Sequence, residues 1–354
     1  MNHRRQITAQ GGNFSNFLGT KSAELSILAI TLLWGLRLSL AALSVFALEC
    51  CYSPAAIRTT QKVTFTSGEA IRTLDIFFFT DDSLGRLDSY QRFSSPVGET
   101  VTGACTRGRR IVSALANSHN REYTWSDVNS HDGLLEVVSD LRDENPRSPL
   151  LRGESLAFAG DDRMTMLSLS PLLCEVVLQR LSCDFSGRSY AGAEITGLKA
   201  YLTNVNALCP VFGESSGNPV DILNRGRLRE SDLEQMACPE MLSGDIGDME
   251  DDFILYPDLR LYCYPNRSAG ESLGSPFTRL VIQGEVDGRV WYWPLDIGRN
   301  GDGGGVEGGC SYSFDVTLTR LGVEDPDTPV QGVAAEVAIA QAPWKTLDDR
   351  YIDF

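Results

Sequence analysis

Short apolar runs separated by turn-forming residues dominate the chain after residue 50 and predict an all-β protein. Residues 62–66 alternate polar and apolar side chains, and residues 73–79 form a β-rich run before an Asp-Asp-Ser-Leu-Gly turn. Further strands are expected at residues 86–93, 111–116, 164–169, 172–181, 194–203, 259–264, 278–285, 289–295, 312–320 and 336–340. Short strands at even spacing favour β-sandwiches over alternating β–α–β units.

One segment departs from this pattern and predicts a short helix. Its apolar residues recur at helical spacing: Leu134, Leu135, Val137, Val138 and Leu141. Ser130 or Asp132 can cap the start, and Asn145-Pro146 ends the helix. The fold expected from these patterns is therefore all-β with one short helix.

The chain is long enough for two domains once an export segment is set aside. Residues 1–50 are assigned to export, and residues 51–212 to a first β-sandwich domain. Residues 213–252 are polar and rich in turn formers, so they are interpreted as a linker. Residues 253–354 then form a second β-sandwich domain.

The amino-terminal segment carries an apolar stretch at residues 25–48 that is interrupted by Arg37. A single membrane-spanning helix would place this charge near its middle, where a charge is costly. Residues 38–48 instead form an eleven-residue apolar run behind a positive charge, as in a secretory signal. We favour the signal and keep the membrane span as the alternative.

Two adjacent cysteines follow the apolar run and indicate lipid attachment. Cys51 has Leu48 three residues before it and a small residue directly before it, a pattern similar to a lipoprotein processing site. Cys50 would place the charged Glu49 at that last position. We therefore favour Cys51 over Cys50 for lipidation, with an ordinary signal peptide as the alternative.

Seven further cysteines lie beyond this pair, and their spacing does not reveal which of them form disulfides. Most are expected to be small buried hydrophobic residues.

Charge and composition exclude several classes of function. The 354 residues include 31 basic and 47 acidic side chains, giving a formal charge of −16, which is poorly suited to binding nucleic acid. Only three histidines are present, so little imidazole chemistry is available. The aspartates at 245–252 lack calcium-loop spacing and are expected to be a solvated linker. We expect no catalytic residues, no metal and no small-molecule cofactor.

The aromatic cluster of Trp291, Tyr292 and Trp293 alternates between the two faces of one expected strand and offers a different hypothesis. Trp291 and Trp293 could form a platform for carbohydrate on an exposed sheet face. Packing in the core is the other interpretation, and we favour it for half of the cluster. A secreted carbohydrate-binding β-sandwich protein is therefore kept as an alternative function.

The order of segments resembles the fimbrillin superfamily, the type V pilus subunits of Bacteroidales, and most closely its lipid-anchored anchor or accessory subunits. The resemblance covers residues 50–354 and rests on the order of six stretches, together with the sequence Leu-Leu-Arg-Gly-Glu at 150–154 that follows the expected helix. These stretches are TLDIFFFTDDSLGRLDSYQRF at 73–93, SCDFSGRSYAGAEITGLKAYLTNVNA at 182–207, CYPNRS at 263–268, FTRLVIQGEVDGRVWYWPLDI at 277–297, SYSFDVTLTRLGVEDPDTPV at 311–330 and APWKTLDDRYIDF at 342–354.

This resemblance implies two tandem transthyretin-like β-sandwiches without enzymatic activity, exported to the outer membrane or cell surface. The implied partners are other pilin subunits, joined by donation of a β-strand, and the outer membrane, reached through a lipid anchor. In this family an Arg-specific protease removes the first strand of stalk subunits. Here that strand is 62–66, with Arg72 as the candidate cleavage site and Arg58 as the other. We expect a base anchor to stay uncut.

The resemblance also implies that the carboxyl-terminal segment supplies the donor strand. Val337 and Ile339 alternate with smaller residues, as a strand that fills a groove would, and Trp344 follows them. The same segment could instead be the closing strand of its own second sandwich, and both interpretations remain open. A stalk or tip adhesin subunit is the alternative to an anchor.

Overall fold

The structure is a computed structural model that describes residues 57–94, 98–120, 123, 125–161, 163–212, 219–299, 304–328 and 335–344. The predicted export segment, with Cys50 and Cys51, lies outside these residues, as does the end of the chain after Trp344. No helix in the described part is long and apolar enough to cross a membrane.

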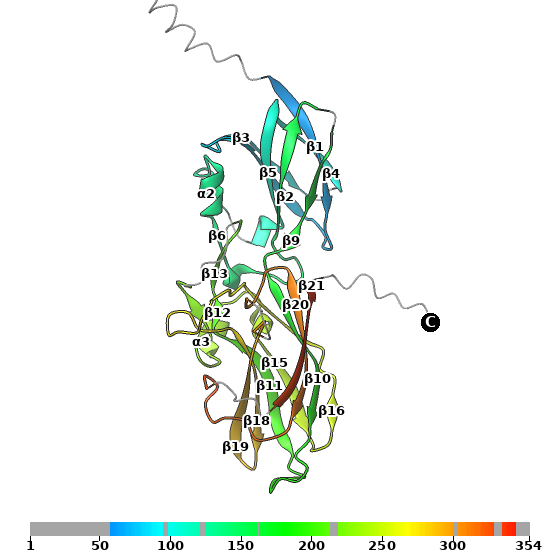
Figure 1. Cartoon of the computed structure of the whole chain (residues 1–354), viewed down its shortest axis with the longest axis vertical. Helices are drawn as coiled ribbons and strands as arrows, with labels where there is room; N and C mark the ends of the chain where they lie inside the picture. The colour runs from blue at the N-terminus through cyan, green and yellow to red at the C-terminus, as the bar shows by residue number, and fades with distance from the viewer. Residues whose placement is uncertain are drawn as a thin grey trace, which may run out of the picture. The chain divides into compact units, whose positions relative to one another are not determined.

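The first lobe consists of two sheets that share one hydrophobic core (Figure 1). The smaller sheet has the order β4(Thr100–Thr106), β1(Arg58–Thr66), β8(Thr165–Ser168). The larger has the order β3(Leu87–Ser94), β2(Thr73–Thr80), β5(Gly108–Ala116), β7(Leu151–Ala159), β9(Ser170–Pro171). Val63 and Phe65 of β1 pack in the same buried cluster as Ile76 and Phe78 of β2, so the two sheets form a sandwich.

The second lobe repeats this arrangement with a larger core. In one sheet β10(Cys174–Cys183) pairs with β16(Ile254–Leu255), β17(Leu259–Cys263) and β20(Cys310–Leu318), and β20 pairs with β21(Ala335–Pro343). The other sheet has the order β15(Ser243–Met249), β11(Ile195–Thr203), β18(Arg279–Val286), β19(Arg289–Asp296). Asp287 and Gly288 have positive φ angles in the tight β18–β19 turn, as a two-residue hairpin requires.

Strand pairing departs from the predicted domain division. Strands β10 and β11 lie before residue 212, yet β10 pairs with β17 and β20, and β11 pairs with β15 and β18. The expected linker also contains β15, which is an edge strand of the second lobe. The pairing therefore divides the described chain between β9 and β10, because long-range partners, rather than local polarity, decide which sheet a strand joins.

The helical content differs from the prediction as well. Helix α2 spans only His131–Leu135, and the Ser130 side chain accepts a hydrogen bond from the Gly133 N–H, which confirms the predicted cap. After it the chain forms β6(Val138–Asp140) and a 3-10 turn, η2(Leu141–Asp143), so the helix ends earlier than expected. The remaining helical turns of the described residues are α3(Glu230–Leu233), η1(Ser118–Asn120) and η3(Pro239–Met241).

The two lobes are joined by paired backbone and by a shared core. Strand β6 pairs antiparallel with β13(Leu208–Pro210), and β12(Val205–Asn206) pairs with β14(Ile222–Leu223) close by in the sequence. Leu115, Leu141 and Leu150 precede β10 but belong to the buried cluster of the second lobe. The lobes therefore do not have fully separate cores.

Candidate functional site

The expected first strand, β1, lies between two neighbours in the small sheet of the first lobe. It pairs antiparallel with β4 over seven residues, from Arg58 opposite Thr106 to Thr64 opposite Thr100. It also pairs in parallel with β8 over four residues. Removal of β1 would therefore leave unpaired backbone groups on both β4 and β8, together with the apolar positions that β1 covers.

The side chains of β1 alternate between core and solvent. Val63 and Phe65 are buried in the cluster between the two sheets, whereas Lys62 and Thr66 are exposed. This period of two is the one predicted for residues 62–66. The buried pair would leave an apolar groove if the strand were released.

Gln61 adds a polar contact to the same buried face. Its side chain is 1% exposed, and its Nε2 donates hydrogen bonds to the Arg163 carbonyl at 2.6 Å and to Thr165 Oγ1 at 3.1 Å. Its Oε1 has no hydrogen-bond partner among the described residues. The hydrogen bonds of the buried Gln61 amide favour the observed pairing of β1 with β8. A shift of β1 along its neighbours would break these hydrogen bonds and leave the amide among apolar side chains.

A free cysteine lies directly across from the start of β1. Cys105 of β4 is the strand partner of Thr59, and its side chain faces the same core as Val63. Burial, helped by the charge of Asp88, raises the pKa of the Cys105 thiol to about 11. This thiol is therefore protonated and unreactive while β1 covers it.

Both candidate cleavage residues border β1 and are exposed. Arg58 is the first residue of the strand, and Arg72 ends the connection at 67–72 that leads into β2. The connection is held by Asn117, which is fully buried with a φ of 61°. Asn117 Oδ1 accepts a hydrogen bond from the Arg72 N–H at 2.9 Å, and its Nδ2 donates to the Ala70 carbonyl at 3.1 Å.

The candidate donor strand, β21, is paired within its own chain. All nine of its residues face β20 in antiparallel register, with Val337 opposite Val316 and Ile339 opposite Phe314. Both side chains are half-buried against the second core. Within the described chain no strand pairs with the other edge of β21.

Trp344 extends the attachment of β21. Its backbone N–H donates to the Gly309 carbonyl at 2.8 Å, and its ring lies 5.5 Å from the ring of Tyr262. In the structure, β21 is therefore an edge strand of the chain's own second sandwich.

The prediction that Trp293 forms part of a carbohydrate-binding platform is wrong. This side chain is completely buried, and its indole Nε1 donates to the Arg320 carbonyl at 2.9 Å. Trp291, two residues earlier on the same side of β19, is half-buried against the same core. Pairing with β18 turns this face inward, so no open pair of ring faces is left for a sugar.

One arrangement near α2 contains the residue types of a hydrolase but not their geometry. Ser113 Oγ donates to Glu154 Oε2 at 2.7 Å, and His131 Nε2 lies 2.7 Å from the same oxygen. A nucleophilic serine needs the histidine as its own base, and Ser113 is fully buried. The three residues instead tie α2 to β5 and β7.

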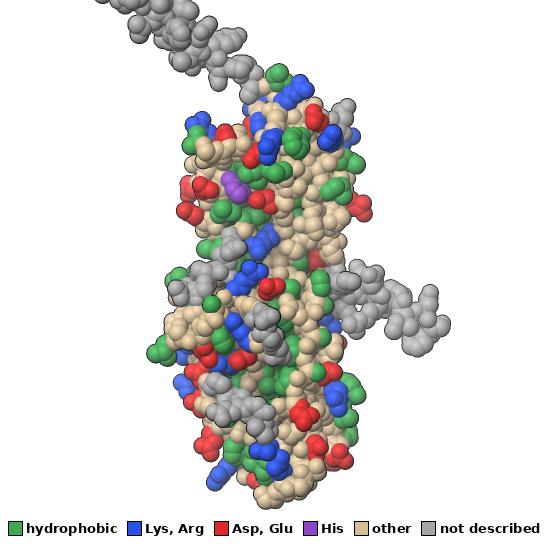
Figure 2. All heavy atoms as spheres, in the orientation of Figure 1, with side chains coloured by type: hydrophobic (Ala, Val, Ile, Leu, Met, Phe, Trp, Pro, Cys, Tyr) green, Lys and Arg blue, Asp and Glu red, His purple; other side chains and the backbone are tan. Residues whose placement is uncertain are grey.

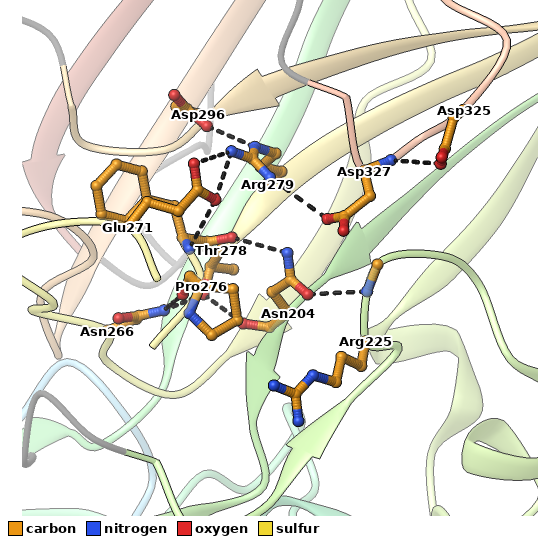
Figure 3. A network of polar contacts seen from close by, with 12 residues as sticks. Asn204, Arg225, Asn266, Glu271, Pro276, Thr278, Arg279, Asp296, Asp325 and Asp327 are labelled. Carbon is orange, nitrogen blue, oxygen red and sulfur yellow. Dashed lines mark hydrogen bonds and ion pairs between the residues drawn. The ribbon is translucent and has the colours of Figure 1, made fainter. Parts of the chain in front are cut away.

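The most charged network in the described chain surrounds Arg279, as Figure 3 shows. Arg279 is buried, and its guanidinium binds both oxygens of Glu271 at 2.6 and 2.7 Å and Asp296 Oδ1 at 2.7 Å. Asp327 lies 3.7 Å away. Charge-assisted hydrogen bonds of this kind fix the loop before β18 onto the sheet.

Two of the acidic residues at 245–252 accept hydrogen bonds from backbone N–H groups. Asp251 accepts hydrogen bonds from the N–H groups of Phe185 and Gly192, and Asp248 accepts one from Gly197. Among the described residues no group of three or more His, Cys, Asp or Glu side chains could hold a metal ion. On the face drawn in Figure 2, basic side chains are scattered among acidic ones rather than gathered in a patch.

No protein-family model matches this sequence, and no curated protein is significantly similar to it. Solved structures are similar in fold. The fimbrilin FimA of Porphyromonas gingivalis has a TM-score of 0.61 at 14% identity, with 81% of this chain and 97% of that chain aligned.

Two other structures give similar values. A candidate cell adhesion protein of Bacteroides eggerthii has a TM-score of 0.59 at 17% identity, covering 82% of this chain and 97% of its own. A candidate cell adhesion protein of Parabacteroides distasonis has a TM-score of 0.58 at 12% identity, covering 82% and 100%. The described chain, built of several sheets and a few short helical turns, therefore has the same fold as the fimbrilin FimA and these bacterial adhesion structures.

Proposed function

We propose that this chain is a non-catalytic subunit of a cell-surface fimbrium that is held in the outer membrane by a lipid on Cys51, or on Cys50. It anchors or terminates the fimbrium, and its partners are other pilin subunits joined by β-strand donation. The fold shared with a fimbrilin supports the class of protein. The position of β21 at the edge of its sheet, paired only with β20 among the described strands, carries the assembly mechanism of the anchor.

The proposed donor is β21 with the segment that follows it. Its side chains alternate, its outer edge has no partner among the described residues, and only β20 holds it along its length. A strand in this position can exchange one antiparallel partner for a groove in a neighbour at little cost in backbone hydrogen bonds. Val337 and Ile339 would be the residues that fill the neighbour's groove.

The anchor and stalk forms of this proposal differ in the fate of β1. A cut after Arg72 would separate a lipid on Cys51 from both lobes, so an anchor keeps β1 and joins the fimbrium only through β21. A stalk or tip subunit loses β1 and receives a strand in its place. The hydrogen bonds of Asn117 to the connection at 67–72 favour an uncut anchor.

Two engineered disulfides test these forms, because the chain already carries a cysteine opposite each strand. Thr59→Cys faces Cys105 and would lock β1 to β4, whereas Pro343→Cys faces Cys310 and would lock β21 to β20. Opposite residues of antiparallel strands have Cα atoms about 4.5–5.5 Å apart, within the range that a disulfide spans.

Each locked variant has a control one residue away. Thr60→Cys and Ala342→Cys point to the other side of their strands and cannot reach Cys105 or Cys310. Each variant is expressed in a Bacteroidales host and its assemblies are separated by size. The readout is the fraction of the chain in high-mass assemblies before and after a reductant is added.

We expect the β21 lock to remove the chain from assemblies, the β1 lock to have no effect, and the reductant to restore the loss. Loss with both locks would identify a stalk or tip subunit instead of an anchor. Assembly that is unchanged with both locks would overturn strand donation.

A separate measurement tests the membrane attachment. The mature amino-terminal peptide is isolated from the same host and its mass determined. An acylated Cys51 or Cys50 with the Arg72–Thr73 bond intact is the expected result. A chain that begins at Thr73 without lipid would rule out the anchor.

A further inference from the structure

Two cysteines face each other across neighbouring strands in the core of the second lobe. Cys174 of β10 is the direct partner of Cys263 of β17 in an antiparallel pair. Both side chains are completely buried in the same hydrophobic cluster. Opposite positions on antiparallel strands place Cα atoms about 4.5–5.5 Å apart, inside the disulfide range of about 4.4–6.8 Å.

The two thiols are also in contact. Burial raises the pKa of the Cys174 thiol well above its usual range, and a hydrogen bond with Cys263 raises it further. The Cys174 thiol also donates to the Glu307 carbonyl at 2.9 Å. Both sulfur atoms therefore lie on the same side of the sheet, within hydrogen-bonding reach of each other.

We propose that Cys174 and Cys263 form a cross-strand disulfide when the chain folds in an oxidising compartment. The reaction consumes one small-molecule disulfide such as oxidised glutathione. The two protein thiols lose two protons and two electrons, one S–S bond forms between them, and the oxidant is reduced to two thiols.

The other described cysteines have different strand partners or neighbours. Cys105 faces Thr59, Cys209 faces Ser139 and Cys310 faces Pro343. Cys183 contacts Asp251, and Cys238 precedes η3. Among the described residues, then, Cys174 and Cys263 are the one pair of cysteines opposite each other in a sheet.

The burial of the two thiols determines when the disulfide can form. Exchange requires a thiolate that an oxidant can reach, and the folded core offers neither. The bond should therefore form while β17 docks onto β10, and a chain folded under reducing conditions should stay reduced. The disulfide would fasten β17 to β10, a strand that also holds β16 and β20.

The experiment refolds the full reduced chain in a mixture of oxidised and reduced glutathione and, in parallel, with reduced glutathione alone. Free thiols are blocked with an alkylating reagent under denaturing conditions, and the unreduced chain is digested and analysed by mass spectrometry. We expect a linked pair of peptides that contain Cys174 and Cys263 in the oxidised sample only.

Controls use variants that remove one thiol. Cys263→Ser should abolish the linked pair, whereas Cys183→Ser, a buried cysteine outside the pair, should leave it unchanged. Because the primary readout is on the unmodified chain, a variant that fails to fold does not affect it. Alkylation of both Cys174 and Cys263 in the oxidised sample, or a link from Cys174 to Cys209 or Cys310, would overturn the proposal.

A second readout measures the effect on the fold. The oxidised chain should unfold at a higher denaturant concentration than the same chain folded and kept in reductant without alkylation. Equal unfolding midpoints for a verified disulfide would contradict its fastening role.

Discussion

Glu144 is a buried polar residue whose protonation depends on a few hydrogen-bond partners. It lies where the lobes meet, and its carboxylate accepts hydrogen bonds from Tyr264 Oη at 2.9 Å and from Ser139 Oγ and the Leu150 N–H at 3.4 Å. Burial raises the pKa of Glu144 to about 7, although these hydrogen bonds lower it in part. The folded chain therefore holds a proton at Glu144 that the unfolded chain releases near pH 4.5.

This shift predicts a loss of stability with rising pH. The folded state binds more protons than the unfolded state between pH 4.5 and about 7, so the contribution of Glu144 is full below that window and is lost through it. The loss is on the order of 3 kcal/mol. Urea unfolding from pH 4 to 8 should show it in the natural chain and not in Glu144→Gln.

The control for this prediction is Glu136→Gln, which changes an exposed glutamate on the same connection. It should keep the pH dependence of the natural chain. A Glu144→Gln variant with an unchanged pH profile would contradict the assignment.

Arg279 gives a second prediction for a single residue. Replacement by alanine would leave the partly exposed carboxylates of Glu271 and Asp296 without their cation and empty a buried space, so we expect a loss of about 2 kcal/mol in the free energy of unfolding. Arg267→Ala removes an exposed ion pair with Glu307 and should cost less than about 1 kcal/mol. Equal unfolding midpoints for the two variants would rule out a structural role for the Arg279 network.

Side-chain hydrogen bonds at the ends of strands hold the connections between them in place. The connection between β1 and β2 is the clearest case. Asn117 receives the Arg72 N–H and donates to Ala70 and Pro149, so one side chain holds the connection against β5 and the start of β7. A protease needs several residues of extended, accessible backbone, which requires these contacts to open first.

Asn117→Gly should therefore speed cleavage after Arg72. Glycine keeps the positive φ of this position but removes all three side-chain hydrogen bonds. The rate is followed with an arginine-specific protease and mass analysis of the fragment that ends at Arg72. Arg72→Lys is the control and should abolish that fragment. An unchanged cleavage rate would show that Asn117 does not guard the site.

Local patterns in the sequence predicted the strands better than their partners. Residues 62–66 and 73–79 lie within β1 and β2, since alternation or a continuous apolar run follows directly from burial on one or both faces. The helix was predicted too long because Val137 and Leu141 have helical spacing, while the chain pairs β6 with β13 and buries Leu141 in the turn η2. The inward face of Trp293 depends on its neighbour β18, which the sequence of β19 does not reveal.

The sequence predicted which residues border and fill the first strand, but not the contacts that hold this strand in place. Arg58, Arg72 and the alternation of Val63 and Phe65 are visible in the sequence. The roles of Gln61, Cys105 and Asn117 are not, because each depends on a residue more than forty positions away in the chain: Arg163, Thr59 and Arg72. Only the register of the folded sheets brings these partners together.

For the whole molecule, the shared core at the junction predicts cooperative unfolding. Leu115, Leu141 and Leu150 of the first half pack in the second core, and β6 is paired with β13. Opening either lobe would expose apolar surface of the other, so both should unfold together. Calorimetry of the chain should give one transition whose calorimetric and van't Hoff enthalpies agree.

The variant that tests this coupling is Tyr264→Phe, which removes a buried hydrogen bond between the halves. We expect it to lower the single transition temperature without splitting the transition. Two separate transitions in the natural chain would contradict the shared core.

The parallel pairing of β10 with β20 also sets the order in which the chain can fold. Glu175 and Ser311 are strand partners although 136 residues separate them. At roughly 5–20 residues per second, a ribosome needs on the order of ten seconds to make the stretch between them. During that time β10, most of whose residues are buried in the finished fold, has no partner on that side. A newly made chain therefore carries an apolar strand at risk of aggregation, and a holding chaperone would protect it until β20 arrives.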